Sequence, residues 1–158
     1  MRIEKISAER TLPLRQEVLR PGRPPAESVF TGDANPEAGH FAVLEQEQEQ
    51  EQGAAIIVAV GTIYREPSGS SHADERMRGP GAWRLRGMAT ADTFRGRGCG
   101  AKVLEACLEH ARRAGADNVW CNARTGAAQF YLRHGFQTMS DVFEMPGIGP
   151  HYLMKRDF

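Results

Sequence analysis

Arg95-Gly96-Arg97-Gly98-Cys99-Gly100 stands between a predicted strand over Trp83–Thr90 and a helical pattern that ends at Gly115. A helix begins with backbone N–H groups that have no partner within the helix, and the helix dipole adds partial positive charge there. Because glycine lacks a Cβ atom, the three glycines of this stretch let an anion approach those N–H groups closely. The two arginines add forked donors for phosphate oxygens. The stretch therefore predicts a phosphate-binding loop.

The spacing of this loop excludes two common phosphate-binding motifs. The dinucleotide motif G-x-G-x-x-G does not fit, because Gly98-Cys99-Gly100 is followed by Ala101-Lys102-Val103. A Walker loop needs four residues between its first glycine and a Gly-Lys-Ser/Thr end, which is absent from this stretch. From this segment alone, a glycine-rich turn that only connects two elements stays a second interpretation.

The rest of the chain shows strand and helix patterns in turn. Helices are predicted over Glu9–Arg20, from the glycine loop to Gly115, and over Thr125–His134. Strands are predicted over Ile3–Ser7, His40–Leu44, Ala54–Tyr64, Trp83–Thr90, Asn118–Ala123, Phe136–Met145 and His151–Lys155. A glycine inside a strand, Gly87, indicates a bulge or a close backbone approach. The order β-α-β-β-β-α-β-α-β-β predicts an α/β fold with a mixed sheet flanked by helices.

Length and repetition bound the domain organisation. A chain of 158 residues makes about one domain and can bury a core without metals or disulfides. We therefore expect a single domain over residues 1–158. Four Glu-Gln pairs fill residues 45–52; they alternate negative charge with polar amides and offer no apolar face. This low-complexity run predicts a solvated hairpin extension.

Composition excludes several classes of protein. Hydrophobic residues at 41% and charged residues at 25% are ordinary for a globular chain. Twenty basic and twenty acidic side chains cancel to zero net charge, which argues against nucleic acid as a partner. The three cysteines form no CxxC pair and no zinc set with the histidines, so we expect a reduced protein without a metal.

No membrane or export signal stands out in the sequence. The charged start Met1–Lys5 lacks the apolar stretch of a signal peptide. The longest apolar run, Ala54–Val60, is far shorter than the ~20 residues that span a bilayer. We expect a soluble, cytoplasmic protein with no membrane partner. The loop histidines His40 and His72, together with His110, are expected to have surface or local hydrogen-bonding roles.

Two motifs resemble the GCN5-related N-acetyltransferase (GNAT) family. That family's signature Arg/Gln-x-x-Gly-x-Gly/Ala stands as Arg95–Gly100, and Met88-Ala89-Thr90 before it resembles the family's fourth strand. Ala127–Phe136 resembles the second motif, an alanine-rich helix that ends in Tyr-x-x-x-Gly-Phe. The predicted element order matches the family fold over nearly the whole chain. The resemblance implies a splayed sheet that holds acetyl-coenzyme A.

The resemblance also implies roles for individual residues. The pantetheine arm would pair with the backbone of Met88, Ala89 and Thr90 like an added strand. The pyrophosphate would bind at the signature, on the amides of Arg97, Gly98, Cys99, Gly100 and Ala101, with Arg95 and Gly96 completing the loop. Tyr131 matches the tyrosine that commonly protonates the departing coenzyme A thiolate, and no metal is implied.

The sequence departs from the family pattern at two places. Many members carry an asparagine seven residues before the tyrosine, where Arg124 stands here. Some carry a glutamate base on the fourth strand, which offers only Arg84 and Arg86. A water chain, Glu144 and His151 are the remaining candidates for the base. Cys99 at a helix start has the position of an activated thiol, although no His–acid pair at a recognisable spacing supports it as a nucleophile.

The sequence thus predicts an N-acetyltransferase that moves an acetyl group from acetyl-coenzyme A to a primary amine by direct attack. The alternative is a coenzyme A-binding sensor or regulatory module that has kept the loop without turnover. The class of the amine acceptor stays open. The oligomeric state also stays open, and a homodimer is one of the alternatives.

Overall fold

The computed structural model describes residues 1–46 and 53–158, which fall into two compact units. Unit 1 comprises residues 1–64 and 87–110, and unit 2 comprises residues 65–86 and 111–158. Residues 47–52, most of the expected Glu-Gln hairpin extension, lie outside the described residues. Its first two residues, Glu45 and Gln46, continue a strand and pair with Ile56 and Ala55.

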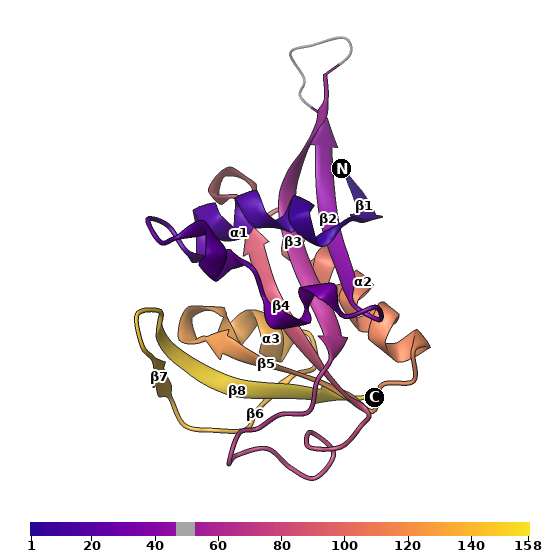
Figure 1. Cartoon of the computed structure of the whole chain (residues 1–158), viewed down its shortest axis with the longest axis vertical. Helices are drawn as coiled ribbons and strands as arrows, with labels where there is room; N and C mark the ends of the chain where they lie inside the picture. The colour runs from indigo at the N-terminus through magenta and orange to yellow at the C-terminus, as the bar shows by residue number, and fades with distance from the viewer. Residues whose placement is uncertain (47–52) are drawn as a thin grey trace. The chain divides into compact units, whose positions relative to one another are not determined.

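Unit 1 contains an antiparallel sheet (Figure 1). Strands β1 (Arg2–Lys5) and β2 (Gly39–Gln46) pair antiparallel, and β2 pairs antiparallel with β3 (Ala55–Arg65). The order continues from β3 to β4 (Ala82–Thr90), whose last four residues, from Gly87, belong to this unit. All four predicted strands are present, with ends shifted by at most two residues.

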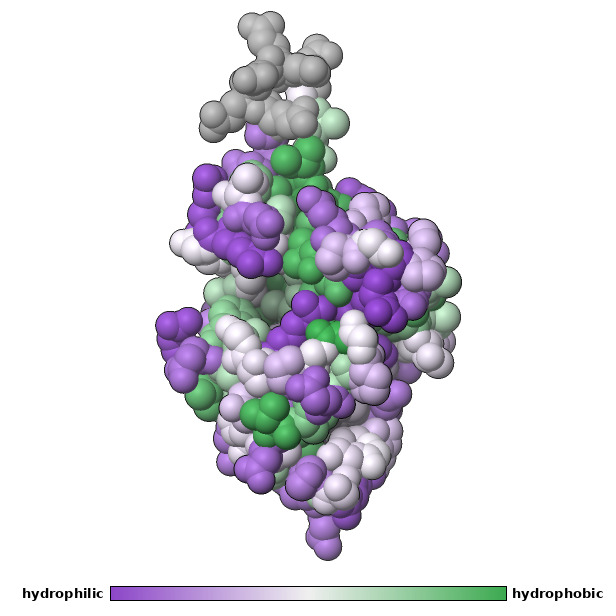
Figure 2. All heavy atoms as spheres, turned by 90° about the vertical axis from the view of Figure 1, so that its left-hand side faces the viewer, coloured by the Kyte–Doolittle hydropathy of each residue, from purple (hydrophilic) through white to green (hydrophobic). Residues whose placement is uncertain are grey.

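Helix α1 (Leu12–Leu19) covers one face of this sheet. A 3-10 turn over Ala8–Thr11 precedes it, so the predicted helix over Glu9–Arg20 is α-helical only from Leu12. Pro13 lies in its first turn, where the missing N–H costs nothing. Leu14 packs in a buried cluster on this face that also contains Ala42, Leu44, Val60 and Ala89. Part of the cluster is only half buried, at Ala55 and Ile57, and Figure 2 shows green residues reaching the surface below the grey atoms.

Helix α2 (Cys99–Arg113) covers the opposite face of the sheet in unit 1. Its predicted apolar stripe is buried, from Val103 to Ala111. A Cβ atom at Gly61 would lie 2.6 Å from both Met88 Sδ and Val103 Cγ1, so β3 and the helix approach closely at this glycine. Neighbouring residues of a strand point to opposite faces of the sheet. Val60 accordingly faces α1, and Gly61 faces α2. The helix ends at Arg113, and Gly115, the predicted stop, follows with a φ of +86°.

Unit 2 contains a mixed sheet around β5 (Asn118–Arg124). Residues Ala82–Arg84 of β4 pair in parallel with the first residues of β5. Strand β8 (Gly149–Asp157) pairs antiparallel with every residue of β5. The short strands β6 (Gln137–Thr138) and β7 (Phe143–Met145) pair with β8 in turn. The short helix α3 (Ala128–Arg133) follows a 3-10 turn over Thr125–Ala127.

The end of the chain differs from the predicted element order. In place of one strand over Phe136–Met145, the structure has β6 and β7, so three strands close the fold and not two. The interruption lies at Ser140, whose hydroxyl oxygen accepts the N–H of Leu153 at 2.9 Å. A side chain thus replaces the backbone acceptor in the ladder, and the strand breaks there.

Candidate functional site

The glycine-rich loop enters α2 through two glycines in the left-handed region. Gly96 has a φ of +74° and Gly98 a φ of +80°, a conformation that residues with a Cβ rarely adopt. A Cβ atom at either position would meet no other atom within 4 Å, so the space beside the loop is open. Gly100 lies within the first turn of α2. The backbone therefore needs glycine at two of the three predicted positions, and the loop leaves room for a ligand.

Backbone N–H groups and two arginines are the potential donors at this loop. Lys102 is the first residue of α2 whose N–H bonds back to the loop, to the Gly98 carbonyl at 3.1 Å. The N–H groups before it belong to the first turn, where a helix supplies no acceptor. The guanidinium of Arg97 lies 4.9 Å from the centre of the Phe94 ring, and Arg95 pairs with Asp92 at 3.1 Å. Both arginines and both left-handed glycines are exposed.

The cysteines do not offer a nucleophile in this structure. Cys99 is 1% exposed, and its sulfur lies 3.8 Å from Met1 Sδ. Burial raises the pKa of the Cys107 thiol and raises that of Cys121 to about 12, so both stay protonated at neutral pH. Within the described residues, no group of three or more His, Cys, Asp or Glu side chains could hold a metal ion.

The three residues of β4 that the sequence predicts for the pantetheine arm all lie in unit 1. Met88 points toward α2, where its sulfur meets Gly61, and Ala89 points toward α1 and its buried cluster. After Thr90 the chain leaves β4 with the Ala91 N–H bonded to the Val58 carbonyl at 2.8 Å. Both side chains are thus used in packing.

Tyr131 lies on α3 in unit 2, in an aromatic cluster. It is 6% exposed, and its ring contacts those of Phe130 and Phe136 edge to face, with centroids 5.2 and 5.3 Å away. Its carbonyl accepts the N–H groups of His134 and Phe136 where the helix ends, and Gly135 has the expected positive φ, +85°. The ring is therefore held in one orientation.

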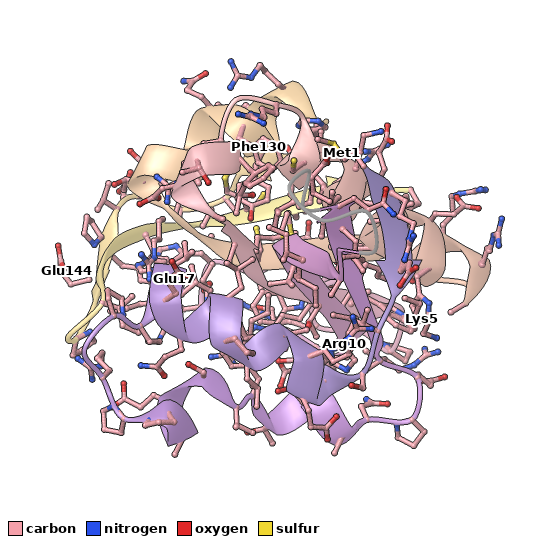
Figure 3. All side chains as sticks on the ribbon, turned by 90° about the horizontal axis from the view of Figure 1, so that it is seen from above. Met1, Lys5, Arg10, Glu17, Phe130 and Glu144 are labelled. Carbon is pink, nitrogen blue, oxygen red and sulfur yellow. The ribbon has the colours of Figure 1, made fainter. Side chains whose placement is uncertain are left out.

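The two side chains considered for the base differ in their surroundings. Glu144 is exposed on β7, and Figure 3 shows it extending outward from the ribbon. His151 is 4% exposed; its Nδ1 lies 2.8 Å from the Gly149 carbonyl, and its ring stacks on Phe143. His40, expected to have a surface or local role, is instead buried in β2 and bonds to Thr62, which is 22 positions away.

Comparison with known proteins identifies the family. The sequence profile of the acetyltransferase (GNAT) family matches residues 8–136. The chain is 27% identical over 154 residues to the uncharacterized N-acetyltransferase YitI of Bacillus subtilis, which covers 98% of this chain and 94% of YitI. The chain therefore belongs to the GNAT family, and its class is that of an acyl-coenzyme A-dependent acetyltransferase.

Solved structures agree with the predicted fold. Escherichia coli ElaA matches with a TM-score of 0.69 at 19% identity, covering 99% of both chains. A chain of the NatC complex bound to Gag peptide and CoA matches with a TM-score of 0.72 at 13% identity, covering 100% of this chain and 99% of that one. These similarities confirm the mixed α/β fold of the family. No helix among the described residues is long and apolar enough to cross a bilayer.

Proposed function

We propose that this protein transfers an acetyl group from acetyl-coenzyme A to a primary amine, which attacks the thioester carbonyl directly. The observation that carries the proposal is the loop at the start of α2, where Gly96 and Gly98 hold left-handed conformations beside open space. In a chain of the GNAT family, that loop is the part of the molecule suited to a pyrophosphate.

The loop residues supply both shape and charge for the coenzyme. The amides of Arg97, Gly98, Cys99, Gly100 and Ala101 would donate to the pyrophosphate oxygens, with the α2 dipole adding partial positive charge. Arg95 and Arg97, both exposed at the loop, would add cationic donors. The pantetheine amides would bond to the backbone of Met88–Thr90 as an added strand. Bound there, acetyl-coenzyme A supplies an activated acyl group.

Tyr131 would supply the proton for the leaving group. As the amine nitrogen bonds to the carbonyl carbon and the C–S bond breaks, the coenzyme A sulfur takes the phenolic proton. The two edge-to-face ring contacts hold Tyr131 in place, so its hydroxyl would not need to reorient during the reaction. The proton that the amine loses would pass to water, His151 or Glu144.

A panel of amines tests this proposal and identifies the acceptor class. The protein is incubated with acetyl-coenzyme A and a polyamine, an aminoglycoside, free amino acids or short peptides, while thiol release is followed with Ellman's reagent. Mass spectrometry then detects the acetylated product. Binding of acetyl-coenzyme A by calorimetry without thiol release that depends on an amine would support the sensor module instead. A cytoplasmic location and the absence of a nucleic-acid partner stay predictions from composition.

A further inference from the structure

A buried arginine ties three elements of unit 1 together. The Arg15 side chain on α1 is 1% exposed and forms a two-pronged ion pair with Asp33, at 2.8 Å from Nη1 and 2.9 Å from Nη2. Nη1 also donates to the Ser28 carbonyl at 2.9 Å, and Nη2 donates to Thr62 Oγ1 on β3 at 2.6 Å. Arg15 therefore fixes the segment that contains Ser28 and Asp33 against the sheet.

These contacts fit one tautomer of a neutral His40. His40 and Thr62 face each other across β2 and β3, with His40 Nδ1 2.8 Å from Thr62 Oγ1. Because a guanidinium can only donate, the Thr62 oxygen accepts from Arg15, and with a neutral ring the Thr62 hydroxyl can donate its own proton to His40 Nδ1. The other ring nitrogen, Nε2, lies 3.2 Å from the Asp33 carbonyl and donates to it. A neutral His40 with its proton on Nε2 satisfies all of these contacts.

This network meets β4 immediately before the predicted coenzyme-binding residues. A Cβ atom at Gly87 would lie 2.8 Å from Phe30 Cε2 and 3.0 Å from Arg15 Nε, so the strand backbone contacts both side chains. The Arg15 guanidinium lies 4.0 Å from the centre of the Phe30 ring, and the Phe30 N–H donates to Asp33 at 2.9 Å. Gly87 has a φ of +68°, and Met88–Thr90 follow it directly.

We propose that Arg15 is a positioning residue for acetyl-coenzyme A: held by Asp33, Thr62 and neutral His40, it fixes the backbone of β4 at Gly87. Through that contact it sets the direction of Met88–Thr90, and protonation of His40 loosens the arrangement. The inference rests on the proposed function, because it assumes that this segment binds the pantetheine arm. It adds a pH-dependent control of binding that lies away from the phosphate loop.

Burial and the neighbouring charges act on His40 in opposite directions. Burial lowers the pKa of His40; contact with the Asp33 carbonyl and the charges of Asp33 and Glu9 oppose this, while the charge of Arg15 adds to it. A second ring proton would be directed at Thr62, whose hydroxyl proton would then lose its acceptor. The imidazolium would also lie near the Arg15 guanidinium. Protonation would therefore reverse the His40–Thr62 hydrogen bond and weaken the link between the histidine and the arginine.

The test compares acetyl-coenzyme A affinity at about pH 7.5 and about pH 5.5 by calorimetry, in the wild type, His40→Asn and His72→Asn. The amide oxygen of asparagine can accept the Thr62 proton but does not titrate. The coenzyme phosphates titrate equally in all three experiments, so the readout is the ratio of the two dissociation constants in each protein. We expect the wild-type ratio to exceed that of His40→Asn by on the order of fivefold. His72, on an exposed loop of unit 2, is the matched control and should keep the wild-type ratio.

Equal ratios in the wild type and a folded His40→Asn variant would overturn the inference and leave the proposed function standing. No binding by the wild type at about pH 7.5 would overturn both. If His40→Asn does not fold, NMR of the wild-type imidazole decides: the expected neutral form carries its proton on Nε2, and a proton on Nδ1 would contradict the network. Thr62→Ser keeps the hydroxyl that links His40 to Arg15 and should keep the pH effect on affinity. Thr62→Val removes that hydroxyl and should reduce the effect.

Discussion

Gly98→Asp should weaken acetyl-coenzyme A binding mainly through charge. Gly98 has a φ of +80° and open space where a Cβ atom would lie, so the substitution meets no steric clash within the protein. The left-handed conformation costs about 1 kcal/mol of stability for a residue with a Cβ. Two unit charges ~4 Å apart in water interact by about 1 kcal/mol. Repulsion by the two charges of a pyrophosphate therefore amounts to about 2 kcal/mol, or roughly 30-fold in affinity.

Two variants separate charge from backbone strain. Gly98→Asn adds a side chain of the same shape without charge, and asparagine tolerates left-handed backbone better than most residues. Gly115→Asp places the same charge at the other end of α2, at a glycine with a φ of +86° and equally open space. Calorimetric titration should show a large loss only for Gly98→Asp, and the loss should shrink at high salt. Equal affinities of a folded Gly98→Asp variant and the wild type would refute the phosphate-loop assignment. Equal losses of affinity in the Gly98→Asn and Gly98→Asp variants would refute charge as the cause.

Three further outcomes are expected. Tyr131→Phe should lower turnover by about 100-fold while acetyl-coenzyme A affinity is kept, because the ring packing survives without the proton; full turnover in that variant would assign the proton to water. Arg15→Met should lower the free energy of unfolding by about 3 kcal/mol, since the Asp33 carboxylate is left buried without its partner. The exposed pair of Arg23 with Glu27 provides the control, and Arg23→Met should have no measurable effect in denaturant titrations. Because burial lowers the pKa of His40, the unfolded chain binds a proton that the folded chain does not, and the free energy of unfolding should fall as the pH drops below about 6.5; a His40→Asn variant with the same decline would contradict this.

Local patterns predicted much of the fold. The buried stripe of α2 follows from residues three and four apart, and Gly115 and Gly135 end their helices with positive φ, as their positions indicate. The close approach at Gly87 was also predictable from a glycine within a strand, although its partners Arg15 and Phe30 were not. In each of these cases a few neighbouring residues decide the conformation.

The roles of other residues depend on contacts between distant parts of the chain and could not be predicted from the sequence. Arg15 bonds to Thr62 across 47 positions, and in the sequence it is one more charged residue beside Leu14 on a short helix. His40 is buried and pairs with Thr62 in a strand register that the sequence does not supply. Ser140 likewise divides the predicted closing strand through a hydroxyl bonded to Leu153. These residues needed the tertiary fold before their roles could be inferred.

Amine-dependent acetyl transfer is the most direct test of the proposed activity. Each amine of the panel is incubated with acetyl-coenzyme A and either the wild type or Gly98→Asp at one enzyme concentration, and acetylated product is quantified by mass spectrometry against released thiol. We predict that at least one primary amine yields product and thiol in equal amounts, with the variant giving far less at subsaturating acetyl-coenzyme A. Thiol released at the same rate with and without every amine, and no acetylated product, would contradict the proposed function.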